Sequence, residues 1–395
     1  MKEVFKIFEE IVKIPHCSGN TDKMKEYLLD KIKSSGYKYK TDTAGNILAY
    51  NKTPVLTFQS HYDMVCVGRA PDIKTFEKDG WLYAESSSLG ADNGIGVAVM
   101  LYLMQKYDNL EFLFTNDEEI GLIGAFNLGL EIKSPYLLNL DSEDENIYIG
   151  CAGGVDVKVK YPLSFTKING YTYQTDIKNM PGGHSGVDID KEIPNAIVEL
   201  INKVKHISSL KGGERRNSIP ANASAKCVIE NENAKEVEVV EKEYLNFLKK
   251  LPHGVLEYDF EFKVVSKSVN FALVENENIV LSLRANSNEK LKEVKEYIKE
   301  KCAGAEIEFE GEYPAWKPEI TPLAKMLKEI MQSEYKVIHA GLECAVLKNK
   351  FPKCAMASIG PVIQNPHSVH ERVNIESVNK FVKTVEELVK RLNNE

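Results

Sequence analysis

The sequence predicts an α/β protein in which an α/β/α domain with a mixed, mostly parallel sheet is interrupted by a smaller α+β domain. Apolar runs typical of strands alternate with helical spacing at the start of the chain, the pattern changes near residue 164, and the first pattern returns after residue 310. A chain of 395 residues is also too long for one ordinary core. We therefore expect one domain from residues 1–163 and 311–395, and a second from residues 164–310.

Apolar strands separated by helices characterise the first segment. Helical spacing is expected at 5–14, 24–34 and 93–107, and strands at NILAY (46–50), PVLTFQS (54–60), EFLFTND (111–117) and YLLNLD (136–141). Strands this rich in apolar residues indicate a sheet that is covered on both faces.

The middle segment mixes alternating strands with amphipathic helices. Strands are expected at 171–178, 223–230, 259–269 and 278–287, a turn at PGGHSGVD (181–188), and helices at 193–207, 235–250 and 290–302. This pattern predicts an α+β domain of the size of a small independent fold.

The last segment returns to the first pattern. We expect a helix at 316–330, a buried segment at 338–347, a strand at 355–361 and a terminal helix at 375–393. A second domain inserted between the halves of the first is the simplest interpretation.

The overall charge argues against two classes of main partner. The formal net charge is −8, which argues against nucleic acid or an anionic membrane as the main partner. No stretch reaches the 18 or so uninterrupted apolar residues of a membrane span, and the amphipathic N-terminus has no signal-peptide core.

The cysteines are odd in number and scattered. All seven, at positions 17, 66, 151, 227, 302, 344 and 354, lie outside any C-x-x-C pair. This pattern indicates neither a disulfide framework nor a zinc ribbon and suits a reducing cytosol, so a cytoplasmic protein is expected.

Three consecutive acids, Asp117, Glu118 and Glu119, follow the apolar run EFLFT. Burying adjacent carboxylates is costly unless a positive charge neutralises them. Ligands of α/β sheets collect at the carboxyl ends of strands, where SHYD and NLDSE are also expected. One shared site is therefore predicted.

Histidines and carboxylates recur at these strand ends and turns: His61-x-Asp63, Asp92 in GADNGIG, Glu118-Glu119, Asp141 in LNLDSE and His367 in NPHS. Together they suit Zn²⁺, Co²⁺ or Mn²⁺ better than an all-oxygen Ca²⁺ site. One carboxylate shared by two ions would hold them about 3.5–4 Å apart, as in two-metal hydrolases.

Each piece also has a structural alternative. His-x-Asp is more often structural than catalytic, and Asp92 could cap the helix that begins near Asn93. Asp141 could close a turn, and His367 could be a packed histidine beside a proline.

The motifs SHYDMV, GADNGIG, NDEEIGLIGA, LLNLDSEDE with IGCAGG, PGGHSGVDI, RRNSIP, HAGLEC and IGPVIQNPHS together resemble the metallopeptidase family M20. Within it they are similar to the aminoacyl-histidine dipeptidase (Xaa-His dipeptidase, peptidase D) branch. The resemblance runs from about residue 4 to 390, and it implies a metal-binding catalytic domain and a lid domain used for dimerisation.

The resemblance implies a role for each residue of the metal centre. The ligands of two divalent ions, zinc or else cobalt or manganese, would be His61 and Asp141 for one, Glu119 and His367 for the other, and Asp92 as the bridge. Asp63 would accept the imidazole N–H of His61 and fix its tautomer. Glu118 would be the general base that takes a proton from the bridging water.

The resemblance also implies roles in the lid. His184 would donate a hydrogen bond to the scissile carbonyl, acting in the neighbouring subunit's site in many relatives, although PGGHSGVD also fits an ordinary hairpin turn. Asn217 and Arg284 would bind amide or carboxylate groups of the substrate, and His339 and Glu343 in HAGLEC would line the pocket near the metals. The expected assembly is a homodimer.

The implied activity is hydrolysis of small peptides, with Xaa-His dipeptides favoured. A tripeptidase, a carboxypeptidase or an N-acyl amino-acid deacylase could use the same centre, because the lid and pocket set specificity. A non-catalytic metal- or peptide-binding protein is a different class. A third is a cysteine hydrolase that uses Cys344 or Cys151, although GCAGG is no nucleophile elbow.

Overall fold

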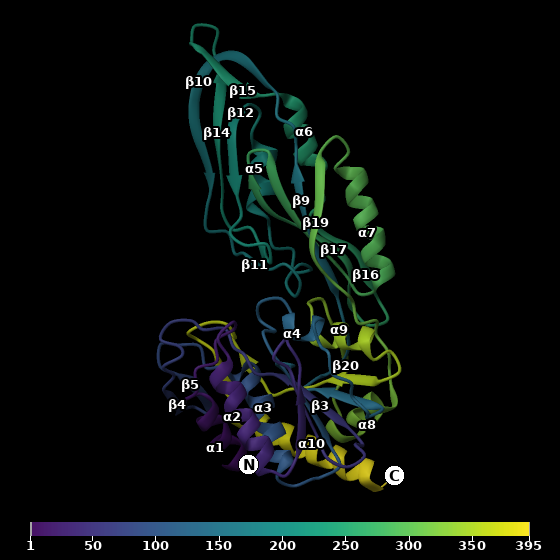
Figure 1. Ribbon diagram of the computed structural model, residues 1–395. Helices are drawn as coiled ribbons and strands as arrows, with labels where there is room; N and C mark the ends of the chain where they lie inside the picture. The colour runs from purple at the N-terminus through teal and green to yellow at the C-terminus, as the bar shows by residue number, and fades with distance from the viewer. Residues whose placement is uncertain (1, 395) are drawn as a thin grey trace. The chain divides into compact units, whose positions relative to one another are not determined.

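The computed structural model describes residues 2–394, which form two compact units (Figure 1). The first unit contains the chain up to Gly150, Pro318–Lys336 and the chain from Leu342. The second contains Cys151–Lys317 and Val337–Gly341. The chain passes from one unit to the other at 150/151, earlier than the expected 163/164, because the strand Gly153–Lys160 pairs with strands of the second unit.

A sheet of eight strands forms the centre of the first unit. Their order is β1 (Lys38–Thr41), β2 (Ile47–Tyr50), β6 (Glu111–Thr115), β3 (Thr57–His61), β7 (Tyr136–Asn139), β21 (Ala355–Ser358), β8 (Ile147–Cys151) and β20 (Tyr335–Ile338). The sheet is mixed: β6, β3, β7 and β21 are parallel, whereas the pairs β1–β2, β2–β6 and β21–β8 are antiparallel. The carboxyl ends of β3, β6 and β7 therefore meet at one edge, as predicted.

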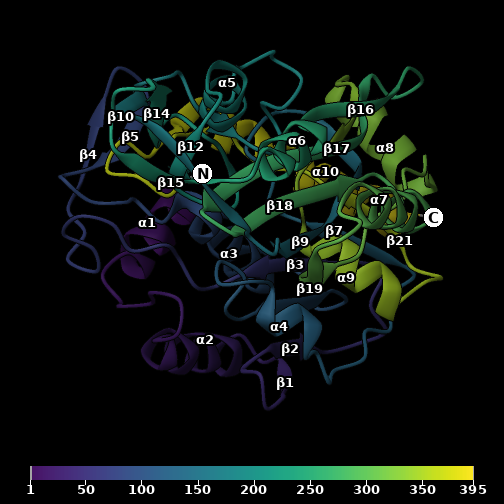
Figure 2. The ribbon, with the colours of Figure 1, turned by 90° about the horizontal axis from the view of Figure 1, so that it is seen from above.

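Helices pack against this sheet. They are α1 (Lys2–Ile11), α2 (Asp22–Ser34), α3 (Ala91–Met104), α4 (Ile123–Phe126), α8 (Pro322–Met331), α9 (Glu343–Lys350) and α10 (Ile375–Asn394). Helix α3 is buried along almost its whole length, as the apolar sequence GIGVAVMLYLM requires. Helix α2 lies beside β1 at one edge of the unit (Figure 2).

A small sheet completes the first unit. Its order is β22 (Ile363–Gln364), β23 (Arg372–Asn374), β5 (Trp81–Ala84) and β4 (Thr75–Lys78). The loop between β22 and β23 carries His367, so pairing at both of its ends restrains this loop.

An antiparallel sheet forms the second unit. Its order is β15 (Glu236–Val240), β10 (Phe165–Ile177), β14 (Ala223–Glu230), β12 (Ile207–Gly212), β17 (Val264–Glu275), β18 (Asn278–Ala285), β9 (Gly153–Lys160) and β19 (Glu306–Tyr313), and β16 (Gly254–Asp259) pairs with β17. The short strands β11 (Gly183–His184) and β13 (Ser218–Ile219) pair separately. Strands with helices on one side match the predicted α+β class.

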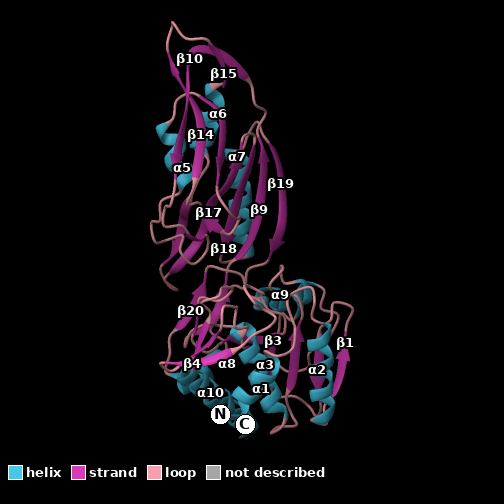
Figure 3. Cartoon of the chain, turned by 90° about the vertical axis from the view of Figure 1, so that its left-hand side faces the viewer, coloured by secondary structure: helices cyan, strands magenta, loops and turns pink. Residues whose placement is uncertain are grey.

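Three helices cover this sheet: α5 (Ala196–Lys203), α6 (Lys242–Lys250) and α7 (Asn288–Lys301), shown in cyan in Figure 3. Their apolar faces share one core with the strands, in which Leu200, Leu248 and Ile298 are fully buried. Asn195 caps α5 and Ser287 caps α7 by accepting backbone N–H bonds.

The helix predicted at 235–250 is only partly correct. Residues Glu236–Val240 form β15, which pairs with β10, and the helix begins at Lys242. The sequence EVEVV alternates charged and β-branched residues with period two, the signal of a strand, which the charged residues on both sides concealed. The strand predicted at 259–269 also begins later, at Val264.

The expectation drawn from the cysteines needs a correction. Cys17 and Cys66 form a disulfide, with Cα atoms 5.5 Å apart, while the other five cysteines are buried and not disulfide-bonded among the described residues. The partners are 49 residues apart in sequence, so no local spacing announces the pair. It joins the loop after α1 to the loop after β3.

Among the described residues, no helix combines the length and the apolar character that a membrane crossing requires.

Candidate metal centre

Five predicted ligands converge at the edge of the first sheet. His61 ends β3, Glu119 follows β6, Asp141 follows β7, Asp92 lies in the first turn of α3, and His367 lies between β22 and β23. Parallel pairing of β6, β3 and β7 brings three of these segments side by side. The fold thus brings together residues that are far apart in the sequence. The widest separation, between His61 and His367, is 306 positions (367 − 61).

Asp92 lies between the two histidines. Its Oδ1 is 3.2 Å from His61 Nε2, and its Oδ2 is 3.1 Å from His367 Nε2. Asp141 Oδ1 lies 3.4 Å from His61 Nε2, and Glu119 Oε1 lies 2.8 Å from His367 Nε2. Two groups that could each hold a metal ion result, one with His61 and Asp141 and one with Glu119 and His367, and both contain Asp92.

The donor atoms of these groups fit divalent cations. Glu119 Oε1 is buried and accepts no hydrogen bond from the described residues, although His367 Nε2 is close. The ligand atoms of each group lie within 4.8 Å of one another, close enough to surround one common point. Two nitrogen and three carboxylate donors around two such points suit Zn²⁺, Co²⁺ or Mn²⁺.

The alternative role of Asp92 as a helix cap does not match its geometry. Its backbone is not helical (φ −84°, ψ 106°), and the N-cap position belongs to Gly90, which has no side chain to offer. The carboxylate of Asp92 is instead directed at His61 and His367.

His61 is held in one tautomer by acceptors on Asp63, and the role expected of the Asp63 carboxylate stays a prediction. Its Nδ1 donates to the backbone carbonyl of Asp63 at 3.0 Å, while the Asp63 carboxylate lies farther away, 3.4 Å from Nδ1. A proton on Nδ1 leaves Nε2 with a lone pair, which is the form that a metal ligand requires.

The Asp63 carboxylate has a further function that the sequence did not reveal. It accepts the backbone N–H groups of Glu118 at 2.9 Å and Glu119 at 3.3 Å, together with the Ser18 hydroxyl at 2.7 Å. Asp63 therefore fixes the turn that carries both glutamates relative to the end of β3.

Asp117 is a structural residue in this turn. It has a positive φ of 52°, and its carboxylate accepts Gly19 N at 2.6 Å and Asn116 Nδ2 at 3.0 Å. The first of the three consecutive acids thus holds the loop that follows α1.

Glu118 forms a third group with His61 and Glu119, and their donor atoms all lie within 4.8 Å of one another. Burial raises the pKa of the Glu118 carboxyl well above its usual range; His61 opposes this shift, and the negative charges of Asp141 and Glu119 add to it. Two adjacent glutamates therefore differ: Glu119 faces His367, whereas no ion pair with His367 involves Glu118 among the described residues.

Further carboxyl groups increase the negative charge of this region. Glu343 is fully buried in α9, where it accepts Gln59 Nε2 at 2.5 Å and Thr115 Oγ1 at 2.7 Å. Burial raises the pKa of Glu343 and of Glu371 to about 7. A bound divalent cation would favour the charged forms. Glu371 was not among the predicted residues, since nothing in its surrounding sequence marks it.

Arg284, in the second unit, is a buried cation with no acidic partner among the described residues. It is 9% exposed, and its guanidinium donates to Tyr313 Oη at 2.6 Å and to Ser185 Oγ at 3.4 Å. Its Nε has no hydrogen-bond acceptor, and no ion pair involves Arg284 within residues 2–394. A buried guanidinium of this kind suits a carboxylate ligand.

His184 lies in the predicted hairpin turn and immediately precedes Ser185, whose hydroxyl accepts a hydrogen bond from Arg284. Its Nδ1 accepts the backbone N–H groups of Gly186 at 3.1 Å and Val187 at 3.2 Å, so the neutral ring carries its proton on Nε2 and can donate there. The predicted turn and the predicted donor are therefore compatible. The backbone carbonyl of Asn217 accepts Ser185 N at 2.9 Å, which places Asn217 beside the hairpin.

His339 belongs to the second unit, whereas its motif neighbour Glu343 belongs to the first. Its Nε2 lies 2.7 Å from Ser268 Oγ, and burial lowers its pKa to about 3 with help from Arg284, so the ring is neutral. A Cβ added to Gly186 would collide with the carbonyl oxygen of His339, so glycine is required there. Placement of His339 beside the metal ligands stays a prediction.

The cysteine alternative does not match the burial of the thiols. Cys151 and Cys344 are both fully buried in the structure. A catalytic thiol must be reached by its substrate.

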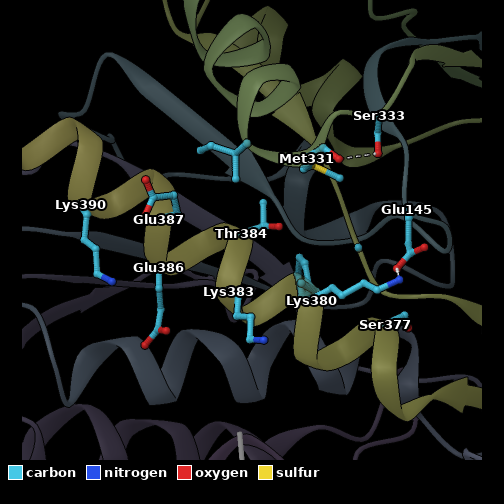
Figure 4. Close-up of a pocket in the computed structure, with 13 residues that line it drawn as sticks. Glu145, Met331, Ser333, Ser377, Lys380, Lys383, Thr384, Glu386, Glu387 and Lys390 are labelled. Carbon is cyan, nitrogen blue, oxygen red and sulfur yellow. Dashed lines mark hydrogen bonds and ion pairs between the residues drawn. The ribbon is translucent and has the colours of Figure 1, made fainter.

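A groove lies along α10 in the first unit (Figure 4). It is lined by both lysines and glutamates, and Lys380 forms an ion pair with Glu145 at 3.3 Å. The opposite charges leave no excess of one sign, in contrast to the carboxylate-rich sheet edge.

A mixed sheet whose parallel strands end in such histidine–carboxylate groups fits a metal-dependent hydrolase. The model of peptidase family M20/M25/M40 matches residues 57–391, which is more than half of the chain. The chain therefore belongs to this family, and the resemblance drawn from its motifs is confirmed.

Two relatives are similar over almost the whole chain. The cytosol non-specific dipeptidase of Escherichia coli (strain K12) is 31% identical, with 98% of this chain and 96% of the relative covered. The crystal structure of aminoacylhistidine dipeptidase from Vibrio alginolyticus has a TM-score of 0.84 and 27% identity, covering 98% of this chain and 96% of that one.

More distant structures share the fold. A tripeptidase from Staphylococcus aureus superposes with a TM-score of 0.64 at 19% identity, covering 100% of this chain and 99% of that one. The two-unit α/β architecture is therefore that of M20 peptidases, as the sequence predicted.

Proposed function

We propose that this chain is a metal-dependent dipeptidase that hydrolyses the peptide bond of small peptides, with Xaa-His dipeptides favoured. The observation that carries the proposal is the pair of ligand groups that share Asp92 in a chain of peptidase family M20/M25/M40. The similarity to two dipeptidases over nearly the whole chain supports the same activity.

The proposed ligands are His61 and Asp141 for one ion, Glu119 and His367 for the other, and Asp92 for both. Zinc is the first candidate, with cobalt and manganese as alternatives. When bound, the two cations would polarise the scissile carbonyl and acidify the water between them.

Glu118 is the proposed general base. Its carboxylate would take a proton from the attacking water and pass it to the nitrogen of the leaving amine. The proposal is supported by its place in a group with His61 and Glu119 and by the hydrogen bond from its backbone N–H to Asp63, which fixes the turn.

Two side chains of the second unit are proposed to bind substrate. Arg284 would pair with the C-terminal carboxylate of the peptide, because its guanidinium is buried with an unsatisfied Nε. His184 would donate from Nε2 to the carbonyl oxygen that becomes negative during attack. Asn217, beside the His184 hairpin, and His339 are proposed to contribute to the same substrate recognition.

The same centre could serve a tripeptidase, a carboxypeptidase or a deacylase, so substrate length and termini must be tested. We expect hydrolysis of free dipeptides, including Xaa-His, to exceed that of tripeptides and N-acetylated amino acids by at least about tenfold in kcat/KM. Purified chain loaded with zinc would be assayed against matched sets of these compounds. Activity confined to tripeptides or acylated substrates would contradict the dipeptidase assignment.

A non-catalytic binding protein is the second class to exclude. In that case the loaded chain would bind dipeptides without releasing amino acids, whereas we expect turnover. A cytoplasmic location and a homodimer complete the proposal. The name of the E. coli relative supports the location, and a molar mass measured in solution would test the dimer.

A further inference from the structure

Glu371 is a buried carboxylate to which the sequence analysis assigned no role. It is 2% exposed and follows His367 by four residues in the loop that ends at β23. None of the principal influences on its pKa is a cation, so its buried charge has to be stabilised in another way.

Four consecutive backbone N–H groups provide that stabilisation. Glu371 Oε2 accepts Leu89 N at 2.7 Å and Gly90 N at 3.1 Å, and Oε1 accepts Ala91 N at 2.8 Å with Asp92 N at 3.4 Å. These groups lie at the N-terminus of α3, whose N-cap residue Gly90 offers no side chain. A carboxylate at a helix N-terminus is also favoured by the helix dipole.

The segment that Glu371 holds carries the shared candidate ligand. Asp92 departs from helical geometry immediately after these amides, and its two carboxylate oxygens face His61 and His367. The direction of the Asp92 side chain therefore depends on the path of residues 89–92, which Glu371 fixes.

The backbone that carries Glu371 is also held in place. Arg372, the next residue, begins β23 and pairs with Tyr83 of β5. Its guanidinium donates to Tyr83 Oη at 2.8 Å and to Gln364 Oε1 at 2.9 Å, and it lies 4.4 Å from the ring centroid of Trp81. Glu371 thus connects Asp92 to a strand that is anchored on both sides.

We propose that Glu371 is a positioning residue of the metal centre, which sets Asp92 against His367 so that one carboxylate can serve two cations. The inference rests on the proposed function, because it concerns the affinity of the same site. Glu371 touches neither a candidate ion nor the substrate; it acts through the backbone of residues 89–92.

The variant Glu371→Gln tests this at constant size. The amide nitrogen of glutamine can only donate, so it would face backbone N–H groups that also donate. Glu371→Asp keeps the charge but is one methylene shorter, and should rescue part of the loss. Glu376→Gln, an exposed glutamate five positions along the same segment (376 − 371), is the matched control.

Metal binding would be measured on metal-free protein by competition with a chromophoric chelator, and Co²⁺ absorption would report the coordination geometry. We expect Glu371→Gln to bind at least one of the two ions about 10–100-fold more weakly. We also expect a changed Co²⁺ spectrum, a lower kcat and a nearly unchanged KM, with Glu371→Asp intermediate and Glu376→Gln like wild type. Faster hydrogen exchange at the amides of residues 89–92 should accompany the loss.

The outcomes separate this inference from the proposed function. A folded Glu371→Gln variant with wild-type affinity for both ions and an unchanged Co²⁺ spectrum would overturn it, even if thermal stability fell, because Glu371 would then be only a helix cap. If that variant does not fold, Glu371→Asp decides by the same criterion. A wild-type chain that does not bind two ions would overturn both proposals.

Discussion

The two units concentrate buried charge of opposite sign. The edge of the first sheet brings together the carboxylates of Asp92, Glu119 and Asp141 with two histidines, and Arg284 stands in the second unit without an acidic partner among the described residues. Charges buried without counter-ions are unfavourable unless a ligand supplies them. The buried carboxylates of the first unit therefore suit cations, and Arg284 of the second unit suits an anion.

The largest expected effect is the loss of kcat when the proposed base in the first unit is removed and the candidate metal ligands are kept. Glu118→Gln removes the proposed base without altering the number of ligands, so kcat should fall about 10²–10⁴-fold. Metal content measured by mass spectrometry should stay as in wild type. The exposed Glu26→Gln is the control. Undiminished hydrolysis by Glu118→Gln would remove Glu118 as the base.

The second effect tests the anion site. Arg284→Gln should raise KM about 10–100-fold for a free dipeptide, because a hydrogen bond to a charged group contributes about 1.5–3 kcal/mol. The same dipeptide with a C-terminal amide should be affected much less. Arg216→Gln is the matched control, since Arg216 already pairs with Asp156 at 3.3 Å. An equal loss on both substrates would contradict a carboxylate contact.

The third effect concerns the loops that support the first unit. The loop closed by Cys17 and Cys66 spans 49 residues, for which the chain-entropy estimate is about 4 kcal/mol of stability. Urea unfolding of the oxidised chain should therefore show a higher midpoint than that of the Cys17→Ser/Cys66→Ser variant. Reductant should lower only the wild-type midpoint; a shift of equal size in the double variant would mean that another process is being measured.

The smallest effect belongs to the core of the second unit. Burial lowers the pKa of His253 to about 4, and its Nδ1 lies 3.3 Å from Asn195 Nδ2 as an acceptor. Between about pH 6.5 and 4 the unfolded chain binds the extra proton, so stability falls as pH falls through this window, by at most about 3 kcal/mol.

His253→Asn keeps an acceptor without a titrating group and should flatten this part of the stability profile. Unfolding midpoints measured between pH 7 and 4 would show the difference. Parallel profiles for the two proteins would mean that other groups cause the loss.

The sequence predicted the region of the candidate metal centre because several candidate ligands directly follow apolar strands in the sequence. His61, the NDEE turn and Asp141 each follow an apolar run, and parallel pairing necessarily brings such ends together. The fold class followed from the same alternation of strands and helices. Assignment of the individual ligands stays a prediction.

What the sequence could not show depends on contacts between distant residues. Glu371 meets the amides of residues 89–92 across a separation of 279–282 positions, and Cys17 meets Cys66 through the folding of two loops. The isolation of Arg284 is likewise visible only when its surroundings are known. The strand Glu236–Val240 was missed for a different reason: its charges suggested a solvated helix, and pairing with β10 decided the outcome.

Counting the cations is the most direct test of the account. The chain would be stripped of metal, titrated with Zn²⁺ by calorimetry and assayed for dipeptide hydrolysis at each point. The account predicts two ions per chain and activity that requires both, with Asp92→Ala losing high-affinity binding of both. Stoichiometric binding of no ion, or hydrolysis that persists in fully stripped protein, would contradict it.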